Sequence, residues 1–344
     1  MKFFINHLRF SFETMTTNWQ TQLVSAFTDF QTLCDYLQLS PNDLNLSSDA
    51  AKQFPLRVPL AFASRIEKGN PLDPLLRQIL PIGDELKTYA GFSDDPVGDL
   101  NAVKQTGVLH KYHGRVLLIN TGACAIHCRY CFRRNFPYAD LQLSKQQESD
   151  VIQAIQNDTS IQEVILSGGD PLILNDARLA RLFEALAEIS TLKRIRIHTR
   201  LPIVLPDRVT DELLELLKHC PKKIIVVVHC NHANEIDTDV AQACQRLKSV
   251  GVTLLNQSVL LQGVNDDATA LCDLSERLFD VGVLPYYLHF LDKANGTGHF
   301  QVSEKEALAL LTVVQNRLSG YLVPKLVTEQ AGELSKQTLK LSVL

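Results

Sequence analysis

Six short runs of apolar, largely β-branched residues recur between residues 115 and 292, and stretches with helical periodicity separate them. The runs read RVLLINTG, EVILSGGD, RIRIHTR, KIIVVVHCN, VTLLNQSVLLQG and LPYYLHFLD. The stretches between them include DARLARLFEALAEI, TDELLELLKHC and DVAQACQRLKSV. Apolar strands that alternate with amphipathic helices predict βαβ units and a parallel sheet. Six such units in series favour an α/β fold that forms a partial (βα)6 barrel over one that forms an open sheet.

The rest of the chain flanks this barrel. Residues 16–90 are predicted to be mostly helical, with TQLVSAFTDFQTLCDYLQ as one helical stretch and SPNDL and NPLDP as breaks. Residues 91–115 are predicted to be loop-rich. We therefore expect a helical N-terminal extension over residues 1–105, the barrel core over 106–320, and a C-terminal strand with a lysine-bearing segment over 321–344.

Polar or reactive residues lie at or near the end of each apolar run. In a parallel barrel the carboxyl ends of the strands surround one mouth, and active sites lie there. Residues that are far apart in the sequence are therefore expected to converge. They are Cys124, Ser167, Gly168, Gly169, Asp170, His198, Arg200, His229, Asn231, His232, Gln257, His289 and Asp292.

Charge and hydropathy exclude several classes of protein. The net charge is −4, which gives no reason to expect nucleic acid as the main ligand. No apolar run approaches the ~20 residues that a membrane-spanning helix needs. The first twenty residues lack the continuous apolar core and small-residue cleavage site of a signal peptide. We therefore expect a cytoplasmic protein without a membrane partner.

Three of the eight cysteines, Cys124, Cys128 and Cys131, form a C-x-x-x-C-x-x-C array. In a long chain without a signal peptide, such cysteines are expected to be reduced thiols or metal ligands rather than disulfides. Zinc is one alternative, with His127 as a fourth ligand, and would indicate a zinc-stabilised binding module without catalysis. An iron–sulfur cluster is the other alternative, because three thiolates leave one iron open to an outside ligand.

The array, with Tyr130 before its third cysteine, resembles that of the radical S-adenosylmethionine (radical SAM) superfamily. The sequence SGGDPL is similar to the glycine motif that follows the second strand in that superfamily. The resemblance implies a TIM-like partial barrel of the radical SAM type, and a [4Fe-4S] cluster whose open iron binds S-adenosylmethionine. It also implies a group of residues around that cofactor, namely Ser167, Gly168, Gly169, Asp170 and His229.

A closer resemblance covers roughly residues 55 to 340, a span estimated from the positions of its motifs. The motifs CRYCFRRNF, SGGDPL, LPDRV, NHANEI, NQSVLLQGVND, YYLHFLDKANGTGHF and AGELSK resemble those of the lysine 2,3-aminomutase family. The most similar branch is the short one that makes (R)-β-lysine for elongation factor P. Membership implies an isomerase that uses pyridoxal phosphate together with the radical cofactor.

The same resemblance implies roles for individual residues. Lys336, in EQAGELSK, matches the catalytic lysine that carries pyridoxal phosphate, and Lys340 is close enough to be a rival. Arg129 and Gln257 fall at positions of the pyridoxal phosphate environment. Three further residues match the substrate site: Arg133 for the lysine carboxylate, and Asp292 and Glu329 for the ε-ammonium. At the last position longer relatives carry aspartate.

The expected reaction converts L-α-lysine to (R)-β-lysine. The family implies an electron donor such as flavodoxin or ferredoxin, and indirectly a β-lysine ligase and elongation factor P. An aminomutase acting on another amino acid, such as glutamate, remains an alternative. The two carboxylates argue against glutamate because buried like charges repel.

Overall fold

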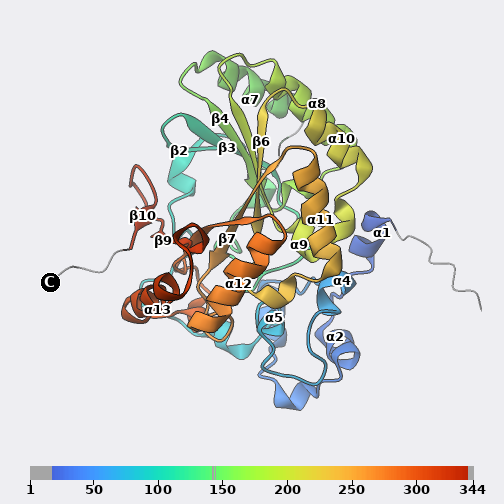
Figure 1. The fold of residues 1–344 in the computed structure, drawn as a ribbon, viewed down its shortest axis with the longest axis vertical. Coiled ribbons are helices and arrows are strands. Elements are labelled where there is room, and N and C mark those ends of the chain that lie inside the picture. The colour runs from blue at the N-terminus through green and yellow to red at the C-terminus, as the bar shows by residue number, and fades with distance from the viewer. Residues whose placement is uncertain (1–17, 142, 144, 340–344) are drawn as a thin grey trace, which may run out of the picture.

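A computed structural model describes residues 18–141, 143 and 145–339, and its centre is a ten-stranded sheet (Figure 1). All six predicted runs form strands: β3 Arg115–Thr121, β4 Glu163–Gly168, β5 Arg194–Thr199, β6 Lys223–His229, β7 Thr253–Val259 and β8 Leu284–His289. They pair in parallel and in chain order, and β9 (Lys325–Thr328) adds one more parallel strand. The predicted parallel α/β fold is therefore confirmed.

Helices follow the parallel strands and cover the outer face of the sheet (Figure 1). The long ones are α7 Lys145–Asn157, α8 Asp176–Ala187, α10 Asp211–His219, α11 Thr238–Ser249, α12 Ala268–Asp280 and α13 Glu304–Arg317. Side chains at their N-termini accept hydrogen bonds from backbone N–H groups that would otherwise lack partners. Thr210 does this for α10 and Asp267 for α12. The main hydrophobic core lies between helices and strands, where each fully buried leucine or isoleucine contributes about 1.5–3 kcal/mol.

Antiparallel strands extend both edges of the sheet. The hairpin of β2 (Val108–Tyr112) with β3, together with β1 (Val103–Gln105), forms one edge. The other edge is β10 (Gln337–Thr338), which pairs with β9. Among the described residues no pairing joins β1 to β10, so the barrel stays open. The loop prediction for 91–115 was therefore wrong for its second half. The alternation of apolar and polar residues in β2 is too short to predict a strand. The segment is a strand because its backbone pairs with β3.

The N-terminal segment is helical, but its helices are short. They are α1 Trp19–Val24, α2 Phe30–Leu37, α3 Ser48–Gln53, α4 Leu60–Ala63 and α5 Pro74–Arg77. The predicted helix over TQLVSAFTDFQTLCDYLQ is two helices, because the backbone of Phe27 exchanges hydrogen bonds of 2.8 and 2.9 Å with Val58. Asp29 then caps α2. Residues 16 and 17 of the predicted helical region lie outside the described residues.

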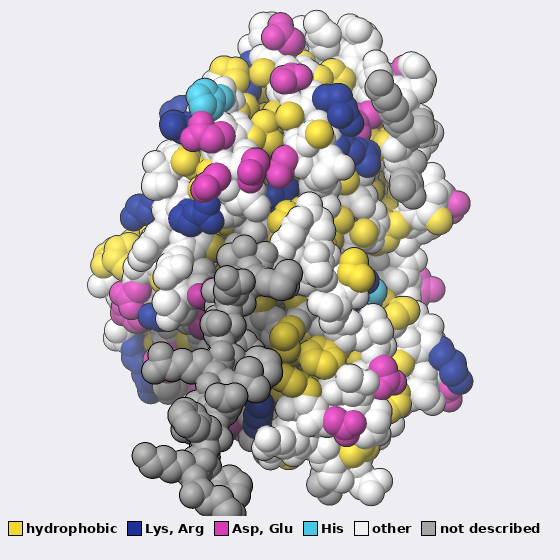
Figure 2. Space-filling model, turned by 90° about the vertical axis from the view of Figure 1, so that its right-hand side faces the viewer, with side chains coloured by type: hydrophobic (Ala, Val, Ile, Leu, Met, Phe, Trp, Pro, Cys, Tyr) yellow, Lys and Arg dark blue, Asp and Glu magenta, His cyan; other side chains and the backbone are white. Residues whose placement is uncertain are grey.

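Acidic and basic side chains lie interspersed on the face that Figure 2 shows, in keeping with 34 basic and 38 acidic residues in the chain. Within the described residues, no helix combines the length and the hydropathy that crossing a bilayer requires.

Arg129 fastens the N-terminal segment to the loop that carries the three cysteines. Its side chain is fully buried and binds the Glu85 carboxylate at 2.8 and 2.5 Å. It also donates to the carbonyl oxygens of Phe54 (2.6 Å) and Ala50 (3.3 Å). Sequence analysis predicted that Arg129 lies near pyridoxal phosphate. That role stays a prediction; the guanidinium is directed toward the N-terminal helices, where it acts as a structural tie.

We predict that Arg129→Met lowers the free energy of unfolding of the cofactor-free protein by about 2–4 kcal/mol, because buried hydrogen bonds to a charged group are lost and acceptors are stranded. Urea unfolding measures this. Arg181→Met, on the exposed side of α8, is the control and should change stability by no more than about 0.5 kcal/mol. Unchanged stability of Arg129→Met would remove the structural assignment.

Candidate active site

The cysteine loop, residues 122–137, connects β3 to α6 (Tyr138–Leu141) and brings three half-buried thiols together. Burial raises the pKa of Cys124 well above its usual value, and charge on Cys131 and Cys128 raises it further. Burial and the charge of Cys128 raise the pKa of Cys131 to about 11. Because Cys128 affects the titration of both Cys124 and Cys131, the three thiols lie near one another, as one centre would require.

The donor set fits a cluster better than a single ion. In the described part of the chain, no three His, Cys, Asp or Glu side chains converge on one point in the manner of a metal-ion site. Thiolates that bind different irons of a cubane need not converge in this way. The alternative fourth zinc ligand, His127, places Nδ1 2.8 Å from the carbonyl oxygen of Pro55 and stacks on Phe54. This imidazole therefore contacts the N-terminal segment.

The glycine turn, residues 167–170, lies directly against the cysteine loop. A Cβ atom on Gly169 would lie 2.2 Å from the carbonyl oxygen of Ala123, and one on Gly168 would lie 2.5 Å from that of Thr121. Gly168 also adopts a φ of +114°, which a side chain would strain. The N–H groups of Gly169 and Asp170 donate to Thr121 (2.7 Å) and Ala123 (2.8 Å). Both glycines are therefore required for close backbone packing.

Asp170 was predicted to lie near S-adenosylmethionine, and the structure gives its carboxylate a set of internal partners. It accepts hydrogen bonds from the hydroxyl of Thr199 at 2.7 Å and from the backbone N–H of Arg200 at 2.7 Å. The N–H groups of Leu172 and Leu201 also donate to it. Asp170 thus holds the segment that follows β5, which begins at Arg200, in a fixed position relative to the cysteine loop.

A second group of residues, here called the charge cluster, contains Asp99, Lys111, Arg133, Asp292, Glu329 and Lys336. Arg133 Nε donates to Asp99 at 2.6 Å, and Lys111 Nζ lies 2.6 Å from the other Asp99 oxygen. Lys111 also binds Glu329 at 2.9 Å, and Glu329 binds Lys336. These ion pairs link residues near β2 and β3 to residues after β9, across the open side of the barrel.

The carboxylates of this cluster differ in their titration. Burial raises the pKa of Asp292 to about 7, with Lys336 lowering it and Glu329 raising it. Burial alone would raise the pKa of Glu329 as well, but Lys336 and Lys111 hold it well below its usual range. Lys336 thus influences the titration of both Asp292 and Glu329, and the roles predicted for these three residues stay predictions.

Sequence reasoning missed Asp99 and Lys111. Both lie in the segment predicted to be loop-rich, and neither belongs to a recognisable motif. The signal that could have found Lys111 is the alternation within VLHKY, which directs it to the same face of β2 as Leu109.

Neutral histidines occupy the ends of three strands. Burial lowers the pKa of His229 and His289 to about 3 and that of His198 well below its usual value. Nε2 of His198 and of His229 has no hydrogen-bond partner among the described residues. The His229 ring stacks on Tyr130 with centroids 5.5 Å apart, and Gln257 on β7 lies beside His229 in register. These unpartnered buried atoms suit polar ligands at the barrel mouth.

Two further predicted residues are Ser167, in the glycine turn, and Lys340. Ser167 Oγ lies 3.4 Å from Arg133 Nη1, which brings the glycine turn to the charge cluster. The rival Lys340 lies outside the described residues.

The chain is similar to a known protein family, to several known proteins and to solved structures. Residues 118–274 match the Radical SAM superfamily. The L-lysine 2,3-aminomutase of Escherichia coli (strain K12) is 48% identical over 327 residues, which cover 95% of each chain. That of Clostridium subterminale is 32% identical over 92% of this chain and 76% of its own length. A radical SAM methyltransferase structure from Sphaerobacter thermophilus has 16% identity and a TM-score of 0.47, covering 64% of this chain and 68% of that one.

We predict that replacing Cys124, Cys128 or Cys131 by alanine removes the iron–sulfur absorbance of anaerobically reconstituted protein, because three thiolates hold the cluster. Cys220→Ala and Cys272→Ala are controls that should retain it. Iron and sulfide analysis of each variant makes the measurement. A triple alanine variant that still bound four irons would contradict the ligand assignment.

Proposed function

The chain belongs to the family of L-lysine 2,3-aminomutases, isomerases that carry a [4Fe-4S] cluster and use S-adenosylmethionine, and we propose that it converts L-α-lysine to (R)-β-lysine. The observation that carries this proposal is the charge cluster. It presents a buried guanidinium and two carboxylates at one barrel mouth, as an amino acid with a distal ammonium requires.

Arg133 is proposed to bind the lysine carboxylate. Asp99 holds its Nε edge, and the Nη1 atom lies beside Ser167. Burial would lower the pKa of Arg133, but Asp99 raises it, so the guanidinium stays charged. A guanidinium that one aspartate fixes in orientation can offer its remaining N–H groups to a carboxylate without losing further side-chain freedom.

Asp292 and Glu329 are proposed to bind the ε-ammonium. Glu329 already accepts a lysine ammonium in this structure, that of Lys336, so its environment suits this group. Asp292 adds a second carboxylate whose ionised form a bound cation favours. A substrate with a terminal carboxylate, such as glutamate, would meet two like charges here, and for this reason we favour lysine.

Lys336 is proposed to hold pyridoxal phosphate. The side chain is 23% exposed, and the neutral imidazoles of His198 and His289 lie within its electrostatic reach. The unpartnered Nε2 of His198 gives a polar cofactor a hydrogen-bonding atom nearby. When bound, pyridoxal phosphate supplies a π system through which an amino group can move from the α- to the β-carbon. Gln257, at the neighbouring strand end, is proposed to contact the same cofactor.

We further propose a cellular role. The chain is 48% identical to the Escherichia coli relative and 32% identical to the clostridial one, and the proposed role rests on the resemblance of its motifs to the short branch. In this proposal the protein works in the cytoplasm, receives electrons from flavodoxin or ferredoxin, and makes β-lysine that a ligase attaches to elongation factor P.

We predict that Lys336→Ala abolishes the covalent pyridoxal phosphate adduct that borohydride traps, because the variant lacks the amine. The cluster should remain, since Lys336 binds the Glu329 carboxylate, whereas the three cysteines are the residues predicted to hold the cluster. Mass spectrometry of the reduced, digested protein locates the adduct, and Lys340→Ala serves as the matched control. An adduct on Lys340 in the unmodified chain would overturn the assignment.

Anaerobic assay with L-lysine, S-adenosylmethionine and pyridoxal phosphate tests the function, with glutamate as the competing substrate. Product β-lysine is the expected result, and β-glutamate would instead support the alternative aminomutase. Asp292→Asn should lower kcat/KM for lysine by about tenfold to a few hundredfold, because a charged hydrogen bond is worth roughly 1.5–3 kcal/mol.

The pH profile of the same assay follows from the raised pKa of Asp292. Ionised Asp292 is the form that binds ammonium, so kcat/KM should rise as pH increases through about 7. Asp292→Asn should lose this rise. If the variant kept both the rise and full lysine use, Asp292 would not bind the substrate.

A further inference from the structure

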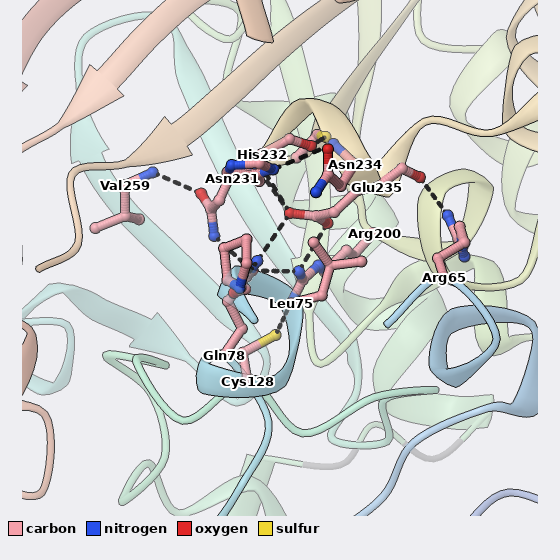
Figure 3. Close-up of polar contacts among 12 residues, drawn as sticks. Arg65, Leu75, Gln78, Cys128, Arg200, Asn231, His232, Asn234, Glu235 and Val259 are labelled. Carbon is pink, nitrogen blue, oxygen red and sulfur yellow. Dashed lines mark hydrogen bonds and ion pairs between the residues drawn. The ribbon is translucent and has the colours of Figure 1, made fainter. Parts of the chain in front are cut away.

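Arg200 connects the end of β5 to the cysteine loop. It follows Thr199 at the N-terminus of α9 (Leu201–Val204), and its side chain points back toward the cysteines (Figure 3). Its Nη1 atom donates to Cys128 Sγ at 2.8 Å. A guanidinium therefore hydrogen-bonds a sulfur that is assigned to the cluster.

Buried acceptors hold this guanidinium in place. Nη2 of Arg200 donates to Gln78 Oε1 at 2.6 Å and to Glu235 Oε2 at 2.9 Å. Glu235 has no exposed surface, and its other oxygen accepts the backbone N–H groups of Asn231 (2.9 Å) and His232 (3.1 Å). Both terminal nitrogens of Arg200 are thus directed by a network that spans three elements (Figure 3).

Aromatic rings shield the contact from water. The Arg200 guanidinium lies 5.3 Å from the ring centroid of Phe62 and 5.6 Å from that of Tyr130. Arg200 is 7% exposed. Arginine keeps its positive charge even when it is buried, and the Glu235 carboxylate pairs with it at 2.9 Å. Charge interactions in such a dry environment are stronger than in water.

We propose that Arg200 sets the reduction potential of the iron–sulfur cluster through its hydrogen bond to Cys128. The inference rests on the cluster assignment given above. An outside one-electron donor of low potential is oxidised and the cluster gains the electron, so the reduced cluster carries one more negative charge. Hydrogen bonds to cluster sulfurs stabilise that charge and raise the potential. Arg200 acts through Cys128 in this scheme and is therefore a positioning residue.

Replacing Glu235 should shift the reduction potential of the cluster in the direction opposite to replacing Arg200. The Glu235 carboxylate offsets part of the positive charge of Arg200. Removing that carboxylate while keeping the guanidinium should therefore raise the potential, whereas removing the guanidinium should lower it. Disruption of packing alone would not produce shifts of opposite sign from two residues in one network.

The experiment compares Arg200→Met, Glu235→Gln and the unmodified protein, each reconstituted anaerobically and titrated by electron paramagnetic resonance at controlled potentials without lysine. Arg200→Met should lower the ratio of reduced to oxidised cluster by tenfold or more at a fixed potential, a shift of about 59 mV for one electron. Glu235→Gln should raise the ratio. Arg208→Met is the control, because Arg208 is also buried but binds Leu172, Leu174 and Asp176, and its ratio should stay within threefold.

Each outcome decides the inference. Arg200→Met with full iron and sulfide content and an unchanged potential would overturn it, as would shifts of the same sign in both variants. If Arg200→Met fails to fold, Glu235→Gln decides alone: an increased ratio supports the inference and an unchanged or decreased ratio contradicts it. Failure of the unmodified protein to assemble any cluster would refute the proposed function instead.

Discussion

The direct backbone contact between the glycine turn and the cysteine loop determines where the parts of the site lie. Two consecutive N–H groups of the turn bind the carbonyl groups of Thr121, at the end of β3, and of Ala123 in the cysteine loop, and no side chain separates them. The turn belongs to β4, the loop continues β3, and these strands pair in parallel register. Asp170 then connects the turn to the backbone of Arg200, and Arg200 reaches Cys128. A shift of any one of these segments would therefore displace the others.

The charge cluster performs a different task on the open side of the barrel. Strand pairing cannot hold this side, because the hairpins at the two edges do not pair with each other in the described part of the chain. Lys111 on one edge and Glu329 on the other form an ion pair in which both side chains are 15% exposed. Partial burial makes such a pair stronger than a surface salt bridge. Glu329, which is proposed to bind the substrate ammonium, therefore also helps to hold the two edges together.

The sequence predicts the parallel strands well, because each run is short, contains buried apolar residues and is separated from the next by a stretch with helical periodicity. The cysteines and the glycine turn are equally clear, since local spacing determines their contacts. What the sequence does not reveal depends on distant partners. The division between α1 and α2 requires Val58, the strand β2 requires β3, and the role of Arg129 requires Glu85. Asp99 and Lys111 gain their significance only from residues that the fold brings to them.

The separation of the charge cluster along the chain has a kinetic consequence. Lys111 and Glu329 are 218 residues apart, and Lys336 lies farther still, so their contacts close only after almost the whole polypeptide has left the ribosome. Contacts of such long range are slow to form because the loop entropy must be lost first. The contacts around the cysteine loop draw largely on residues 50–235 and can assemble earlier. A nascent chain can thus form the contacts around its three thiols while the segment that carries Glu329 and Lys336 is still being synthesised.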